Sequence, residues 1–129
     1  MLRQGVISPF VHGLAGYAIG ILLIVAPFLL DFEAGAAVAV SIVAGIFALV
    51  LEASSDLPTG LARVIPAGVH FVVDVLIAAV LVASPFLFGF TDESAPTAVF
   101  LVTGIAGLLL TIGTRFDRGE RRPDDARSA

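Results

Sequence analysis

Four long apolar stretches follow one another along the chain, at about residues 9–30, 35–52, 66–88 and 95–113. Each is close to the roughly 20 residues that an α-helix needs to cross a hydrocarbon layer of about 30 Å. Inside a bilayer every backbone N–H and C=O group must find a partner within the protein, so such stretches form helices. A β-barrel would need alternating polar and apolar residues, which these runs lack. The sequence therefore predicts an all-α membrane protein with four transmembrane helices.

Composition narrows the class of function. Of the 129 residues, 58% are apolar and only 14% are charged. A few spans of about 20 residues each take up this length, so we expect no separate soluble catalytic domain. Cysteine is absent, so disulfides and thiolate chemistry are excluded. We find no phosphate-binding glycine loop, no serine nucleophile elbow, no metal-binding spacing with enough ligands and no basic surface for nucleic acid. We expect a protein that is not an enzyme, holds no metal or cofactor, binds no nucleic acid and has the lipid bilayer as its partner.

An internal repeat relates the two halves of the chain. An offset of 58 positions pairs His12 with His70, Pro27 with Pro85 and Phe28 with Phe86, and an offset of 59 then pairs Gly45 with Gly104. Each repeat holds two spans, so both copies enter the membrane from the same side. The repeats are therefore expected to be parallel and related by a pseudo-two-fold axis along the membrane normal.

Arginine sets the predicted orientation. All seven basic residues are arginines, and they lie before the first span, in the middle loop at Arg63 and after the last span, whereas the other two loops are acidic. The positive-inside rule then places both termini and the middle loop in the cytoplasm. The absence of lysine and the abundance of alanine, valine and glycine suggest a GC-rich bacterial or archaeal genome, so we expect the cell membrane of a bacterium or archaeon. No leader cleavage site follows the first span, so we expect it to be retained. The expected parts are a cytoplasmic segment 1–8, repeat 9–53, cytoplasmic linker 54–65, repeat 66–114 and disordered cytoplasmic tail 115–129.

Two segments near the ends of the first and third spans carry a resemblance. The sequences APFLLDF, from Ala26 to Phe32, and SPFLFGF, from Ser84 to Phe90, resemble the Ser-Pro-Trp motif of the SPW-repeat membrane proteins. Phenylalanine replaces both tryptophans, and alanine replaces the first serine. The resemblance covers about residues 10–114 and implies an architecture of two repeats with two helices each. It implies no catalytic residue.

These helix-break segments also have a physical interpretation. A proline inside a helix removes a backbone donor, so it kinks or ends the helix. Pro27-Phe28 and Ser84-Pro85-Phe86 therefore indicate helix exits with a collar of aromatic rings at the outer interface. The alternative is that the two breaks line a pocket on the pseudo-two-fold axis, as in transporters with broken helices.

The polar residues inside the spans form the candidate site. Asp74 lies about 12 Å along the third span, where a carboxylate costs at least about 2.5 kcal/mol unless it is paired. His70 is four residues earlier and shares its helix face. His12 is the repeat mate of His70, whereas Gly16 occupies the position of Asp74. Three interpretations stay open: a structural hydrogen-bonded network that includes Tyr17 or a serine, a proton relay through His70 and Asp74 in a small transporter, and ligation of a b-type haem by His12 and His70.

Two further patterns are interpreted as structural. Glu52 and Asp56 end the second span and are expected to form a solvated boundary, with Arg63 offsetting their charge. Small residues recur every fourth position in several spans, which lets helices approach closely within one chain or between chains. The leading functional hypothesis is a noncatalytic packing or assembly component of the membrane that forms a homo-oligomer or joins another membrane protein.

Overall fold

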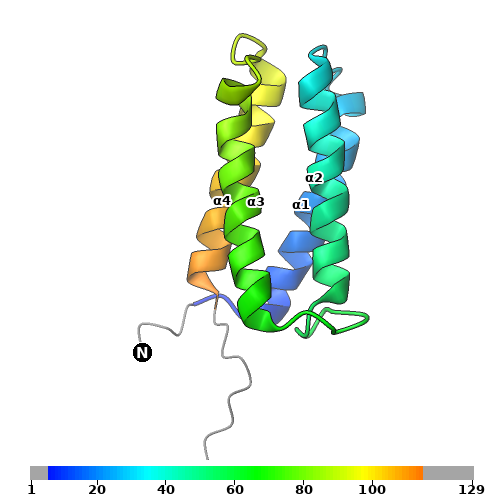
Figure 1. Cartoon of the computed structure of the whole chain (residues 1–129), viewed down its shortest axis with the longest axis vertical. Coiled ribbons are helices and arrows are strands. Elements are labelled where there is room, and N and C mark those ends of the chain that lie inside the picture. Colours follow the sequence, from blue (N-terminus) through cyan, green and yellow to red (C-terminus); the bar gives the residue numbers. More distant parts are fainter. Residues whose placement is uncertain (1–5, 115–129) are drawn as a thin grey trace, which may run out of the picture.

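The computed structural model describes residues 6–114 and contains four helices: α1 (Pro9–Leu29), α2 (Gly35–Ser54), α3 (Ala67–Leu87) and α4 (Ser94–Gly113) (Figure 1). Each helix is long and apolar enough to cross a membrane. No β-strand lies among the described residues. The predicted all-α class with four spans is confirmed, and every helix boundary falls within two residues of its predicted position. The predicted tail 115–129 and residues 1–5 lie outside the described range.

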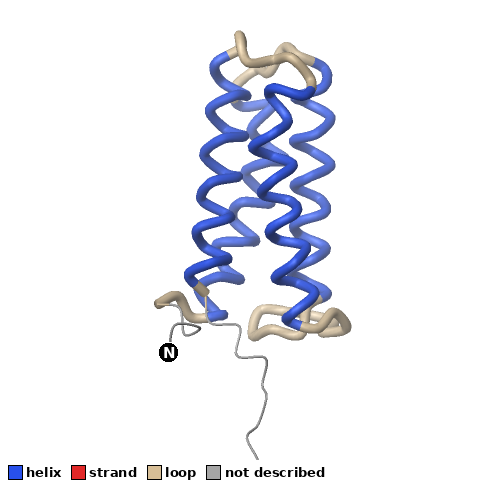
Figure 2. Tube along the Cα trace, turned by 60° about the vertical axis from the view of Figure 1, so that its left-hand side comes forward, coloured by secondary structure: helices blue, strands red, loops and turns tan. Residues whose placement is uncertain are grey.

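The helices stand as two pairs, α1 with α2 and α3 with α4, joined by the loop between α2 and α3 (Figure 1). Figure 2 shows this loop at one end of the bundle and the α1–α2 and α3–α4 loops at the other. The chain ahead of α1 meets the end of α4, where Ile7 N–H donates to Gly113 O at 3.0 Å. Helix lengths of 21, 20, 21 and 20 residues match between the pairs. The rotation that relates the two halves stays a prediction.

Glycine allows close packing within each pair. A Cβ atom added to Gly45 of α2 would lie 2.6 Å from the carbonyl oxygen of Gly20 in α1. In the other pair, a Cβ atom on Gly104 of α4 would lie 3.1 Å from the carbonyl oxygen of Ala78 in α3. Ser41 Oγ also donates to Leu23 O at 2.5 Å across the first pair. At Ser41, Gly45 and Gly104 the small residues therefore serve packing between neighbouring helices of the same chain.

The apolar core lies towards the end of the bundle that carries the α1–α2 and α3–α4 loops. Leu23, Ala26, Leu81 and Phe100 are almost completely buried there, and the Phe100 ring meets Phe90 edge to face with centroids 5.2 Å apart. Only 28% of the apolar window of each helix is buried, and many large apolar side chains face outwards. Such a surface requires a hydrocarbon environment, so the chain is a multi-pass membrane protein in contact with lipid.

Pro27 and Pro85 lie in the last turns of α1 and α3, each two residues before the helix ends. Their carbonyl oxygens accept hydrogen bonds at 3.0 Å from the N–H groups of Phe32 and Phe90. The residues between, Asp31 and Gly89, have positive φ angles of 54° and 71°, as in a Schellman helix end. Phe28 and Phe86 point outwards and are 69% and 65% exposed, whereas Ser84 donates to Val80 O at 2.6 Å. These segments are helix exits with exposed aromatic rings.

Candidate functional site: a buried histidine and carboxylate cluster

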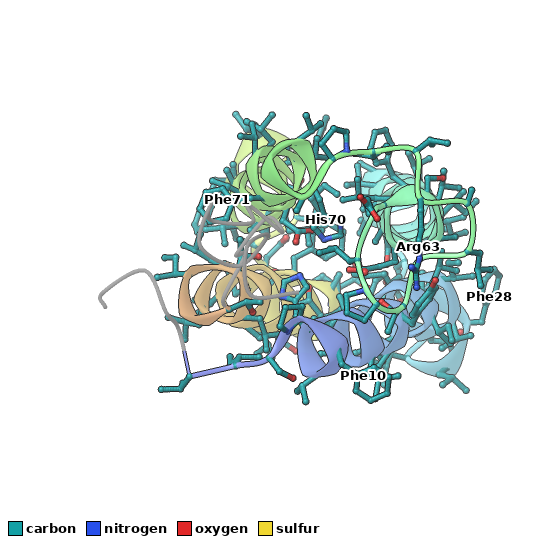
Figure 3. The ribbon with its side chains drawn as sticks, turned by 90° about the horizontal axis from the view of Figure 1, so that it is seen from below. Phe10, Phe28, Arg63, His70 and Phe71 are labelled. Carbon is teal, nitrogen blue, oxygen red and sulfur yellow. The ribbon has the colours of Figure 1, made fainter. Side chains whose placement is uncertain are left out.

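Four titratable side chains meet inside the bundle near the end that carries the α2–α3 loop. His12 comes from α1, Glu52 from α2, and His70 and Asp74 from α3, and one ligand atom of each lies within 4.8 Å of the others. His12, Glu52 and His70 are at most 4% exposed, and the Asp74 side chain is 16% exposed. Figure 3 shows His70 turned towards the space between the helices, whereas Phe10 and Phe28 point outwards. We call these four residues the histidine–carboxylate cluster.

Asp74 is the centre of the cluster. Its Oδ2 atom lies 2.9 Å from His12 Nε2 and 3.0 Å from His70 Nε2. Glu52 Oε1 lies 3.5 Å from His70 Nε2 and 4.0 Å from His12 Nε2. Thr111 of α4 also donates to Asp74 Oδ2 at 3.4 Å. All four helices therefore contribute a polar side chain to the same point.

Hydroxyl groups hold the far side of each imidazole. His12 Nδ1 lies 3.0 Å from Thr114 Oγ1, and His70 Nδ1 lies 2.6 Å from Ser55 Oγ. Both hydroxyls donate to helix carbonyl oxygens, of Leu110 and Leu51 respectively, and so accept from the imidazoles. Each imidazole is then a donor at Nδ1, and its Nε2 faces the carboxylates.

The expectation that Glu52 marks a solvated boundary is wrong. Glu52 is 2% exposed because it turns inwards from α2 into the cluster. Asp56, one turn later, is exposed as expected. Arg63 does not pair with Glu52; its guanidinium donates to the carbonyl oxygens of Gly60 and Pro58 in the loop.

Tyr17 lies beside the cluster without joining its hydrogen bonds. Its hydroxyl donates to Thr59 O at 2.8 Å, which fastens the α2–α3 loop against α1. Gly13 supports this contact, because a Cβ atom there would collide with the Thr59 side chain. The loop therefore folds over the end of α1 that carries His12.

Sequence reasoning missed Ser55, Thr111 and Thr114 and did not place Glu52 in the cluster, although the repeat offers a signal for all four. The offset of 59 positions that aligns the second helices pairs Glu52 with Thr111 and Ser55 with Thr114. Gly16, which stands where the second half has Asp74, leaves room for Glu52, since a Cβ atom on Gly16 would collide with the Glu52 carboxylate. Each half therefore supplies one histidine, one hydroxyl partner and one carboxylate. The carboxylate lies on the second helix of the first half, as Glu52, but on the first helix of the second half, as Asp74.

A small cavity adjoins the cluster along the bundle axis. The cavity has a volume of about 50 Å³, and residues of all four helices line it, including His12, Glu52 and Asp74. This volume is large enough for at least one water molecule beside polar groups. At its far end lie Leu23 and Leu81, which belong to the apolar core. Neither Pro27 nor Pro85 is among its lining residues.

The haem interpretation does not fit this geometry. A porphyrin held by His12 and His70 must lie between the two Nε2 atoms. The Asp74 carboxylate occupies that space, at 2.9 and 3.0 Å from them, and the adjoining cavity is far smaller than a porphyrin. The residues present match proton or cation binding better than haem ligation.

The fold and the cluster define a small four-helix membrane protein with a buried ionisable centre. The family model described as SPW repeat domain matches residues 10–114. The chain therefore belongs to the SPW repeat family. No curated protein and no solved structure matches it.

Proposed function

We propose that this protein is a noncatalytic component of the cell membrane in which the histidine–carboxylate cluster fastens two helix pairs into one bundle. The observation that carries the proposal is the position of the cluster. His12 belongs to the first pair and Asp74 to the second, and their side chains lie 2.9 Å apart in the bundle interior. Lipid offers no competing partner, so such contacts hold the pairs together.

A second observation favours this role over a proton relay. A relay across the membrane needs polar groups or water on both sides of the cluster. At the far end of the cavity lie Leu23 and Leu81, and Phe100 belongs to the same apolar core; each of the three is at most 2% exposed. Proton exchange between the cluster and one side of the membrane is compatible with this core, whereas transport needs a further opening.

The proposal includes a membrane orientation and a partner. The described ends of the chain and the Arg63 loop lie on one side of the bundle, and the positive-inside rule assigns that side to the cytoplasm of a bacterium or archaeon. The apolar outer surface suits lipid, a second copy of this chain or another membrane protein. We propose packing or assembly within the membrane as the role of this surface.

Measurement of proton flux into vesicles tests whether the cluster is structural or relays protons. The purified chain is reconstituted into liposomes that contain a pH-sensitive dye, and a potassium gradient with valinomycin supplies the potential. We expect the same flux from these vesicles as from protein-free vesicles. Flux that exceeds this background, and that Asp74→Asn abolishes while the helical circular dichroism is retained, would overturn the proposal in favour of a proton relay.

A further inference from the structure

We propose that His12, Glu52, His70 and Asp74 form a binding site for one divalent transition-metal ion, with Zn²⁺ as the best-fitting ion. The inference concerns the same cluster and rests on its role as the join between the helix pairs. A cluster without metal can still join the pairs, so the two proposals fail separately.

The spacing of the four ligand atoms matches a tetrahedral site. Zinc binds histidine nitrogen and carboxylate oxygen at about 2.0–2.2 Å, which separates neighbouring ligand atoms by about 3.3–3.6 Å in a tetrahedron. Four of the six separations in the cluster are 2.9, 3.0, 3.5 and 4.0 Å, and all six are within 4.8 Å. These four separations lie within about 0.7 Å of the tetrahedral spacing, so small side-chain shifts bring these pairs of atoms to the distances that one ion requires.

Both imidazoles are oriented as metal ligands. Histidine ligands usually donate their second ring N–H to a neighbouring acceptor, which fixes the ring and directs the other nitrogen to the metal. Here His12 Nδ1 contacts the Thr114 hydroxyl and His70 Nδ1 contacts the Ser55 hydroxyl, so both Nε2 atoms point at the carboxylates. Nitrogen and oxygen acceptors thus converge on one point, and a cation satisfies all of them.

Glu52 adds an independent reason to expect an ion. Its side chain is 3% exposed, and its Oε2 atom has no hydrogen-bond partner among the described residues. A buried carboxylate oxygen without a partner is costly inside a membrane. A divalent ion would balance the two carboxylates of the cluster, which leaves the buried centre neutral.

The ligand types select the class of metal. Ca²⁺ and Mg²⁺ prefer six or more oxygen ligands, whereas imidazole suits zinc, copper, iron and nickel. Two imidazoles with two carboxylates in a compact set of four favour a tetrahedral ion, and zinc adopts that geometry most readily. The adjoining cavity leaves space for a water molecule beside the ion.

Zinc content measured by mass spectrometry tests the site. The full chain is purified in mild detergent through a tag that lacks histidine, stripped with a chelator, incubated with Zn²⁺ and desalted. We expect one zinc ion per chain. Glu52→Gln and Asp74→Asn, which preserve side-chain shape, should each weaken zinc binding by more than about 100-fold, since second-shell losses alone cost about 10- to 100-fold. Ser55→Ala should fall in that second-shell range, measured by competition with a zinc-binding dye.

Asp56→Asn is the matched control, because Asp56 is an exposed acid one turn from Glu52. It should bind zinc as the unchanged chain does. Circular dichroism verifies that every variant keeps its helix content. If the unchanged chain retains no more zinc than the folded Glu52→Gln/Asp74→Asn double variant, the metal site is refuted. In that case, a loss of stability in Asp74→Leu would still support the joining role of the cluster.

Discussion

His12 Nε2 and Asp74 Oδ2 lie 2.9 Å apart, although 62 positions separate the two residues and they belong to different helix pairs. Asp74 makes an equally short contact, at 3.0 Å, with His70 on its own helix. The contact of Asp74 with His70 follows from the four-residue spacing within α3, whereas the contact with His12 depends on how the two helix pairs pack. The same carboxylate oxygen makes both contacts. This double role makes Asp74 the residue whose loss should affect the bundle most.

We expect Asp74→Leu to lower the free energy of unfolding by about 1–3 kcal/mol, because it removes the carboxylate that both imidazole Nε2 atoms contact in the buried cluster. Asp74→Asn should retain most of the stability, since the amide group can still hydrogen-bond to the imidazoles. Unfolding in mixed micelles of mild detergent and dodecyl sulfate, followed by circular dichroism, measures both.

Asp56→Leu controls for the loss of an acid as such. Asp56 is exposed, so this change should alter stability by no more than about 0.5 kcal/mol. Equal stability of Asp74→Leu and Asp56→Leu would show that the cluster contributes nothing to joining the helix pairs.

Gly16→Ala should also destabilise the bundle, by about 1–3 kcal/mol, although it adds only a methyl group. The added Cβ atom collides with the Glu52 carboxylate, which must then move away from His70. The same unfolding measurement detects this loss.

Gly107→Ala is the matched control within α4, because a Cβ atom there meets nothing within 4 Å. It should leave stability unchanged or raise it by up to about 1 kcal/mol, as expected for glycine replaced by alanine in a helix. A Gly16→Ala chain as stable as Gly107→Ala would contradict the position of Glu52 described above.

The sequence predicts the helices well because long apolar stretches in a bilayer have one solution. The predicted start at residue 9 and end at residue 113 match the structure, and Pro27 and Pro85 lie at helix exits, as their effect on backbone hydrogen bonding suggests. The packing of helix against helix is harder to predict, since an apolar side chain such as Leu23 can face lipid or core at similar cost.

The cluster could be predicted only in part. His70 and Asp74 share a helix face, so their spacing brings them together, but the approach of His12 depends on how two helix pairs pack. The sequence predicts a solvated Glu52 because this residue stands near a predicted helix end, where acids normally meet water. The burial of Glu52 depends on the space that Gly16 leaves in α1. The sequence around Glu52 gives no indication of this space.

Exchange of the cluster residues between the halves tests the repeat. If the halves are related by a rotation about the membrane normal, Gly16→Asp, Glu52→Thr, Asp74→Gly and Thr111→Glu together move each carboxylate to its symmetric position. We expect this quadruple variant to fold and to keep most of the stability of the unchanged chain. Gly16→Asp alone should cost about 3–5 kcal/mol, because it buries a third carboxylate without a counter-charge.

Thermal unfolding in detergent compares the two variants directly. A quadruple variant that is as unstable as Gly16→Asp would indicate that the two halves are not equivalent around the cluster. The internal repeat would then hold for the sequence but not for the packing of the helices around the cluster.

Reporter fusions test the predicted orientation. The α2–α3 loop, which contains Arg63, and the described ends of the chain lie at one end of the bundle, and the α1–α2 and α3–α4 loops, which contain Glu33 and Asp92, lie at the other (Figure 1). Because arginine is retained on the cytoplasmic side, alkaline phosphatase should be active when fused at residues 33 and 92 and inactive when fused at residue 60. A cytoplasmic reporter such as green fluorescent protein should give the opposite pattern at the same three positions. Active phosphatase at residue 60 would reverse the orientation and place the histidine–carboxylate cluster near the outer face of the membrane.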